Sequence, residues 1–171
     1  VFVEYDDFLT RLDDTGDDFV DKAKGRLPFQ NAQEAGNYMD KLRGYEAEDN
    51  NGPWKNKLIF VADDEHQGDS HTQFGHMEQT ERISSNAINR EHFDISEVYL
   101  HEYPFDGSVK PQASAALAEE WNEGGLLVCY FGHGSPYQLA DELVLKKSVV
   151  YSLNNGNRLP LFLPLSCSVG D

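Results

Sequence analysis

The sequence has 171 residues, of which 39% are apolar and 12% aromatic, and this excludes a wholly disordered chain. Its 14 basic and 30 acidic residues give a net charge of −16, which argues against nucleic acid and anionic membrane surfaces as partners. No apolar run approaches the roughly 18 residues that a membrane-spanning helix needs. Because the chain starts at Val1 and ends soon after an apolar run, we expect it to be a piece of a longer protein.

The first 26 residues are rich in Asp and are typical of a solvated loop segment. Clustered carboxylates can also hold calcium, but this segment has no calcium-loop spacing. Calcium is therefore left open as a structural ion, and we expect no cofactor to be required.

A helix is predicted after residues 25–28. Asn31 can cap its first turn and Glu34, three residues later, can complete a capping box. The Asn-, Gly- and Pro-containing stretch that follows is typical of a linker. We therefore predict that residues 1–46 end an upstream subdomain, residues 47–53 form a linker, and residues 54–171 begin a second subdomain.

Beyond the linker, short apolar runs alternate with segments that have helical spacing. The runs predict strands at 57–62, 97–101, 126–131 and 161–165, and the segments between them predict helices at 77–88, 113–121 and 146–153. Strands that are apolar throughout are typical of a parallel sheet with helices on both faces. The fold class is therefore α/β, with three layers and a mostly parallel sheet.

Chemically reactive side chains follow three of these strands. Asp63, Asp64 and Glu65 come after the first strand, His133 after the third and Cys167 after the fourth. Parallel strands share one carboxyl edge, so we expect these side chains to lie close together. A thiol needs a nearby base to become a nucleophile at neutral pH, and an imidazole oriented by an acid is such a base.

The second cysteine, Cys129, lies inside an apolar run, and we interpret it as a buried thiol with no role in the chemistry.

The motif at residues 132–135 (GHGS) and the ending at residues 159–171 (LPLFLPLSCSVGD) resemble the gingipain family of cysteine peptidases, relatives of caspases and legumains. The resemblance extends upstream to residues 25–28, to Trp54 and to the strand that ends before Glu65, and it therefore covers nearly the whole chain. It implies a caspase-hemoglobinase type of fold, here truncated at its C-terminus, with residues 54–171 as the N-terminal part of the catalytic subdomain.

The resemblance also implies an endopeptidase in which Cys167 is the nucleophile, His133 the general base and Glu65 the orienting acid. The backbone N–H groups of Gly134 and Cys167 would form the oxyanion hole, with no catalytic metal. A protein or peptide substrate, export by the type IX secretion machinery, and a secreted or cell-surface location are further implications.

Two other functions remain open at this point. The ending and the ADDE run at residues 62–65 also resemble the sortase-like C-terminal signal peptidase of the type IX system. A peptidase-like domain that has lost activity could instead be a surface binding module. Specificity for Arg is not carried over, because no acid aligns with the family's specificity pocket among residues 71–76.

A zinc site is the remaining alternative. His66, His71 and His76 recur every five residues, with Asp69 and Glu78 near them. A five-residue period drifts around a helix, unlike the spacing of the metalloprotease motif. A solvated loop is therefore the favoured interpretation of this stretch.

Overall fold

The computed structural model describes residue 25 and residues 27–64 and 75–169. The Asp-rich segment and its open question of calcium lie outside these residues. The chain divides into two compact units, Val1–Asp40 and Lys41–Asp171. The upstream subdomain, linker and second subdomain proposed from the sequence remain predictions. Within the described part of the chain, no helix is both long enough and apolar enough to cross a membrane.

Helix α1 spans Ala32–Glu46 and starts where the capping pattern predicts. Asn31 Oδ1 accepts a hydrogen bond of 2.9 Å from the Glu34 N–H. Glu34 Oε2 in turn accepts a hydrogen bond of 2.9 Å from the Gln30 N–H. Both bonds satisfy amides that have no partner inside the helix, and this fixes its first turn.

Two short 3-10 helices, Glu48–Asn50 and Pro53–Asn56, occupy the stretch that the sequence marks as a linker. Trp54 in the second of them is buried, so the chain is already anchored immediately before the first strand.

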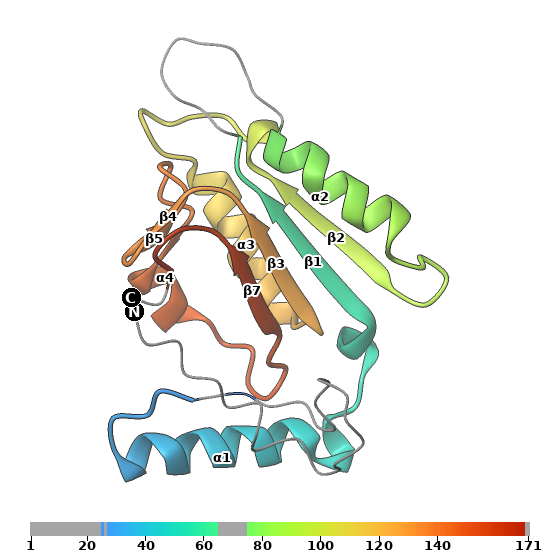
Figure 1. The fold of residues 1–171 in the computed structure, drawn as a ribbon, viewed down its shortest axis with the longest axis vertical. Coiled ribbons are helices and arrows are strands. Elements are labelled where there is room, and N and C mark those ends of the chain that lie inside the picture. Colours follow the sequence, from blue (N-terminus) through green and yellow to red (C-terminus); the bar gives the residue numbers. More distant parts are fainter. Residues whose placement is uncertain (1–24, 26, 65–74, 170–171) are drawn as a thin grey trace, which may run out of the picture. The chain divides into compact units, whose positions relative to one another are not determined.

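Four strands form a parallel sheet in the order β2-β1-β3-β7 (Figure 1). They are β1 (Lys57–Ala62), β2 (Asp94–Tyr99), β3 (Leu127–Phe131) and β7 (Leu161–Leu165). The central pair, β1 and β3, is apolar on both faces, as buried parallel strands are. The predicted parallel sheet is confirmed.

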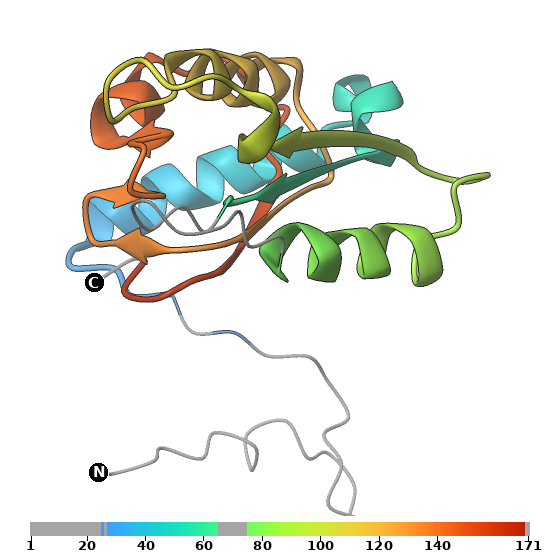
Figure 2. The same cartoon turned by 90° about the horizontal axis from the view of Figure 1, so that it is seen from above.

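Helices cover both faces of this sheet, which confirms the three-layer α/β architecture. Helix α2 (Gly75–Asn86) lies on one face, and α3 (Pro111–Glu123) and α4 (Lys147–Ser152) lie on the other (Figure 2). Alternate strand residues pack into two separate cores. The core under α3 includes Ile59, Val61, Val128, Tyr130 and Leu117. The core under α2 includes Leu58, Phe60, Cys129 and Phe131.

The structure differs from the sequence-based expectation in two places. Strand β2 begins at Asp94 rather than at residue 97, and its apolar end continues into a 3-10 helix, Leu100–Glu102. A small antiparallel sheet of two-residue strands, Gly134–Ser135 (β4), Gln138–Leu139 (β5) and Leu145–Lys146 (β6), follows β3. Such short strands have no hydrophobic periodicity to reveal them.

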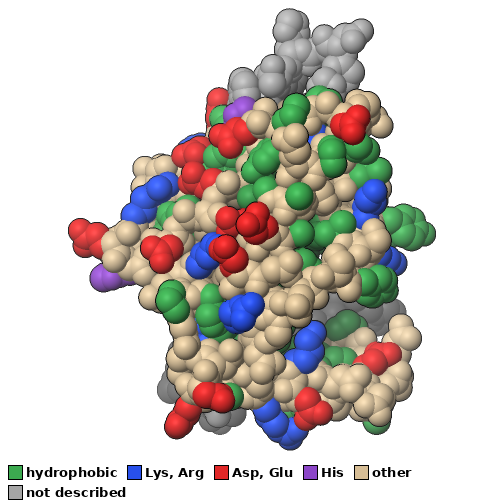
Figure 3. Space-filling model, turned by 180° about the vertical axis from the view of Figure 1, so that it is seen from behind, with side chains coloured by type: hydrophobic (Ala, Val, Ile, Leu, Met, Phe, Trp, Pro, Cys, Tyr) green, Lys and Arg blue, Asp and Glu red, His purple; other side chains and the backbone are tan. Residues whose placement is uncertain are grey.

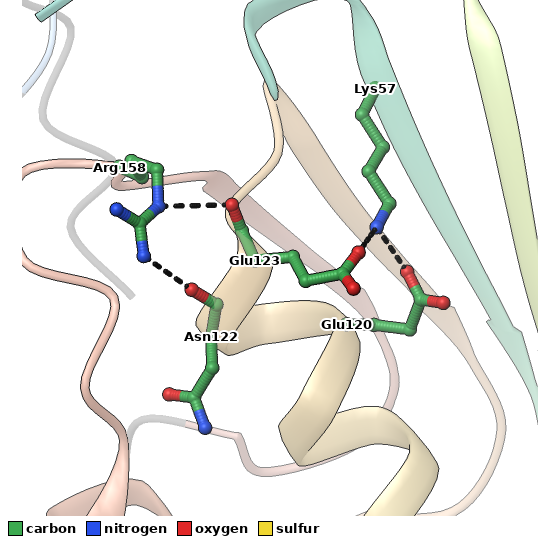
Figure 4. Close-up of polar contacts among 5 residues, drawn as sticks. All are labelled: Lys57, Glu120, Asn122, Glu123 and Arg158. Atoms are coloured by element: carbon green, nitrogen blue, oxygen red, sulfur yellow. Dashed lines mark hydrogen bonds and ion pairs between the residues drawn. The ribbon is translucent and has the colours of Figure 1, made fainter. Parts of the chain in front are cut away.

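The C-terminal end of α3 is tied to two other elements (Figure 4). The Lys57 ammonium lies 2.6 Å from a carboxylate oxygen of Glu120 and of Glu123. Burial opposes the charge of Lys57, but the hydrogen bonds to the two carboxylates outweigh it and raise the pKa of this lysine. Arg158 donates to the backbone carbonyls of Glu123 and Asn122 at 3.0 and 2.8 Å. The chain that leads into β7 is therefore anchored to the end of the helix.

Acidic and basic side chains of the described residues are interspersed over the face of the molecule drawn in Figure 3, with no large patch of a single charge.

Candidate active site

The β3–β7 pairing brings the predicted histidine and cysteine to one edge of the sheet. In this parallel pair Phe131 is the partner of Leu165. His133 and Cys167 each come two residues after these partners, so they leave neighbouring strands at the same level. The loops touch: a Cβ added to Gly134 would lie 3.2 Å from the Cys167 carbonyl oxygen and 2.4 Å from Ser166 Oγ.

The two cysteines have opposite environments. Cys167 is exposed, whereas Cys129 is buried in the core under α2. Burial raises the pKa of the Cys129 thiol, which keeps it protonated and unreactive. The interpretation of Cys129 as a buried thiol is confirmed.

His133 is exposed, and its ring contacts the ring of His76. The ring centroids are 5.4 Å apart and the planes are nearly perpendicular, at 85°. His76 lies in the first turn of α2, so this helix provides one wall of the site. The sequence offered His76 only as part of a zinc alternative; the other two histidines of that alternative, His66 and His71, lie outside the described residues.

The predicted orienting acid, Glu65, also lies outside the described residues, but its two neighbours are described. The Asp63 carboxylate accepts a hydrogen bond of 2.9 Å from the backbone N–H of His133. The Asp64 carboxylate forms a buried ion pair with the Lys110 ammonium. The two aspartates that follow β1 therefore have different partners, and Asp63 is the one connected to the histidine loop.

A cluster of buried carboxylates lies behind the histidine loop. Carboxylate oxygens of Asp63, Asp64 and Glu142 lie within 4.8 Å of one another. Burial raises the pKa of Glu142, and the charges of Asp64 and Asp63 raise it further. Carboxylate oxygens are the ligands that a hard cation such as calcium prefers. Here the ammonium of Lys110 already supplies a positive charge beside Asp64.

Lys110 and Glu142 lie beside the candidate site, and the sequence analysis did not predict either of them there. Both are charged residues in polar stretches, where exposure is the ordinary expectation. Lys110 is 2% exposed and Glu142 is 4% exposed. No local pattern in the sequence marks either residue as buried, because burial here depends on the partners that the fold brings to them.

The predicted oxyanion-hole residues also lie at this edge. Gly134 begins β4 and pairs with Leu139, and Cys167 lies in the bend at residues 166–168 that follows β7. An exposed thiol, an imidazole two residues after the neighbouring strand and backbone N–H groups at Gly134 and Cys167 are the parts that acyl transfer requires. Their roles stay predictions.

Comparisons with known proteins bear on the family and the fold of this chain. The family model "Peptidase family C25" matches residues 2–171. The crystal structure of the Arg-specific cysteine proteinase gingipain R (RgpB) is similar to this chain, with a TM-score of 0.65 and 21% identity over 99% of the chain. The complex of Porphyromonas gingivalis RgpB pro- and mature domains has a TM-score of 0.63 and 20% identity over 96% of the chain. No curated protein matches the sequence.

The chain spans 37% of the length of each of these two solved chains. At this identity the structural likeness shows the fold.

Proposed function

Because the chain belongs to peptidase family C25, we propose that it contributes the nucleophile and the general base of a cysteine endopeptidase. The observation that supports this most directly is the register of β3 and β7, which starts the loops of His133 and Cys167 at the same step of neighbouring strands. An imidazole and an exposed thiol at the carboxyl edge of a parallel sheet are the arrangement that nucleophilic acyl transfer needs.

In the proposed reaction, His133 accepts the proton of the Cys167 thiol, and the thiolate sulfur attacks the carbonyl carbon of the peptide bond. The resulting oxyanion is stabilised by the N–H groups of Gly134 and Cys167. When the C–N bond breaks, the His133 imidazolium gives its proton to the leaving amine and a thioester remains. Water, deprotonated by His133, then attacks the thioester carbon, and the free acid and the thiol are released.

Glu65 is the proposed orienting acid for His133. The proposal includes no preference for Arg, which belongs to the solved relative named above. Family membership also supports a protein or peptide substrate, and export to the cell surface or medium, with the type IX machinery as partner. The net charge of −16 agrees with such a location.

The test is the pH dependence of thiol alkylation in the protein, followed by mass spectrometry between pH 5 and 9. Cys167 is the candidate, and buried Cys129 is an internal control of the same residue type. An activated thiolate should make Cys167 react at pH 6 at least about tenfold faster than a free thiol of ordinary pKa. His133→Ala should remove this advantage. Slow labelling of Cys167 that does not change with His133→Ala would overturn the peptidase proposal and favour a binding module.

A further inference from the structure

The backbone of His133 is held at both of its polar groups by buried side chains. Its N–H donates to Asp63 Oδ2 at 2.9 Å. Its carbonyl oxygen accepts a hydrogen bond of 2.6 Å from the Tyr130 hydroxyl and another of 2.9 Å from the Ala140 N–H. Side-chain bonds to both groups of one loop residue leave that residue little conformational freedom.

Asp63 is itself fixed in place. It is 3% exposed, and its own N–H donates to the Phe131 carbonyl at 2.9 Å, which extends the β1–β3 pairing by one step. Its second carboxylate oxygen accepts a hydrogen bond of 2.8 Å from the Asp64 N–H. The carboxylate therefore presents Oδ2 to His133 from a rigid position at the end of β1.

Tyr130 supplies the donor for the carbonyl. Its side chain is fully buried in the core under α3, and its hydroxyl lies 2.6 Å from the His133 oxygen but 3.4 Å from Asp63 Oδ2. Its single proton therefore belongs to the shorter bond. Burial, and then the negative charge of Asp63, raise the pKa of Tyr130, so the hydroxyl remains a donor throughout the working pH range.

Gly132 makes this approach possible. A Cβ at this position would lie 2.3 Å from the Asp63 Cβ and 2.5 Å from the Tyr130 hydroxyl oxygen. Any larger residue would push the two side chains away from the His133 backbone. Asp63, Tyr130 and Gly132 thus form one unit that spans the ends of β1 and β3.

We propose that Asp63 and Tyr130 are positioning residues that hold the His133 backbone, and through it the imidazole, at the distance at which the base serves Cys167. This inference rests on the proposed function. Glu65 is the acid proposed to orient the imidazole ring, whereas Asp63 acts on the backbone amide of His133. Misplacing a base by about 1 Å is enough to cost about 100-fold in rate.

The first experiment asks whether the hydrogen bonds exist, without reference to activity. Hydrogen exchange of the His133 amide is measured in the wild type, Asp63→Ala and Tyr130→Phe. The matched control is Tyr99→Phe, which removes another buried phenol whose hydroxyl donates to Glu81 Oε1 at 2.9 Å instead of to the His133 backbone. We expect exchange at His133 to accelerate at least about tenfold in Asp63→Ala and to stay unchanged in the control. Unchanged exchange in Asp63→Ala would overturn the inference.

The second experiment is a double-mutant cycle on the alkylation of Cys167 at pH 6. Asp63→Ala should slow labelling about tenfold or more, and Tyr130→Phe should slow it by a smaller factor. Because Asp63 acts through the imidazole, Asp63→Ala should have no further effect once His133 is Ala. Effects that multiply in the double variant, or a wild-type rate in Asp63→Ala, would overturn the positioning role.

The two experiments separate the two proposals. If wild-type Cys167 were not activated and did not respond to His133→Ala, the peptidase proposal would fail whatever the amide does. If Cys167 were activated but the cycle were additive, only the positioning role would fail.

Discussion

The buried ion pair between Lys110 and Asp64 should be among the most sensitive points of the fold. Lys110 is 2% exposed, and its ammonium also donates to the Leu100 carbonyl at 2.7 Å. Lys110→Met keeps most of the apolar stem and removes the charge. It would leave three carboxylates, Asp63, Asp64 and Glu142, with oxygens within 4.8 Å and without their buried cation.

The magnitude follows from the interactions that are lost. Two unit charges at about 4 Å interact by about 4 kcal/mol at an effective dielectric constant near 20. Removing one partner of a buried pair typically costs about 3–5 kcal/mol, because the other charge remains desolvated. Since whole domains are stable by only about 5–15 kcal/mol, Lys110→Met should remove a large part of the stability.

The assay is equilibrium unfolding in urea at pH 7, with Lys57→Met as the matched control. Lys57 also pairs with two carboxylates, but the side chain of one of them, Glu123, is 62% exposed. Lys57→Met should therefore lower the free energy of unfolding by only about 1 kcal/mol or less. Adding Asp64→Asn to Lys110→Met should recover part of the loss. If Lys110→Met cost no more than Lys57→Met, the reasoning that the Asp64 carboxylate is desolvated and depends on Lys110 would be refuted.

Two further predictions concern residues around the same edge of the sheet. The pKa of Glu142 is raised by burial and by Asp64 and Asp63, so the folded chain binds a proton that the unfolded chain releases. The free energy of unfolding should therefore fall as the pH rises through the folded pKa of Glu142. Glu142→Gln should flatten this pH dependence and stabilise the protein at pH 8, as measured by urea titrations. An unchanged pH dependence in this variant would contradict a raised pKa for Glu142. Gly134→Ala would place a methyl group 2.4 Å from Ser166 Oγ, so Cys167 alkylation should slow about tenfold. Gly36→Ala, which meets open space, is its control, and equal rates in the two variants would argue against the close packing.

The parallel sheet could be predicted because its strands are continuous apolar runs bounded by polar residues. The predicted strands at 57–62 and 161–165 match β1 and β7 in full, and the predicted helices at 77–88 and 113–121 overlap α2 and α3 closely. Placing His133 and Cys167 at one edge needed only the rule that parallel strands share a carboxyl end.

The polar interior could not be predicted in the same way. Whether a lysine such as Lys110 is buried depends on which carboxylate the tertiary fold brings to it, and Asp64 is 46 residues away in the chain. The hydrogen bond from the Tyr130 hydroxyl to the His133 carbonyl likewise depends on the geometry of the strand and its loop. From the sequence, a tyrosine in a strand is predicted only as a core residue.

The register of β3 and β7 also determines where this chain tolerates changes in length. Side chains alternate between the two faces of a strand, so a one-residue deletion within Leu161–Leu165 would invert the face of every residue after it and shift Cys167 by about 3.3 Å along the strand. The loops between β3 and β7 have no such constraint, because extra residues there leave the pairing of Phe131 with Leu165 intact. Insertions that accumulate over evolution should therefore collect at residues 153–157, between α4 and the Arg158 anchor, while the distance from Leu161 to Cys167 stays constant.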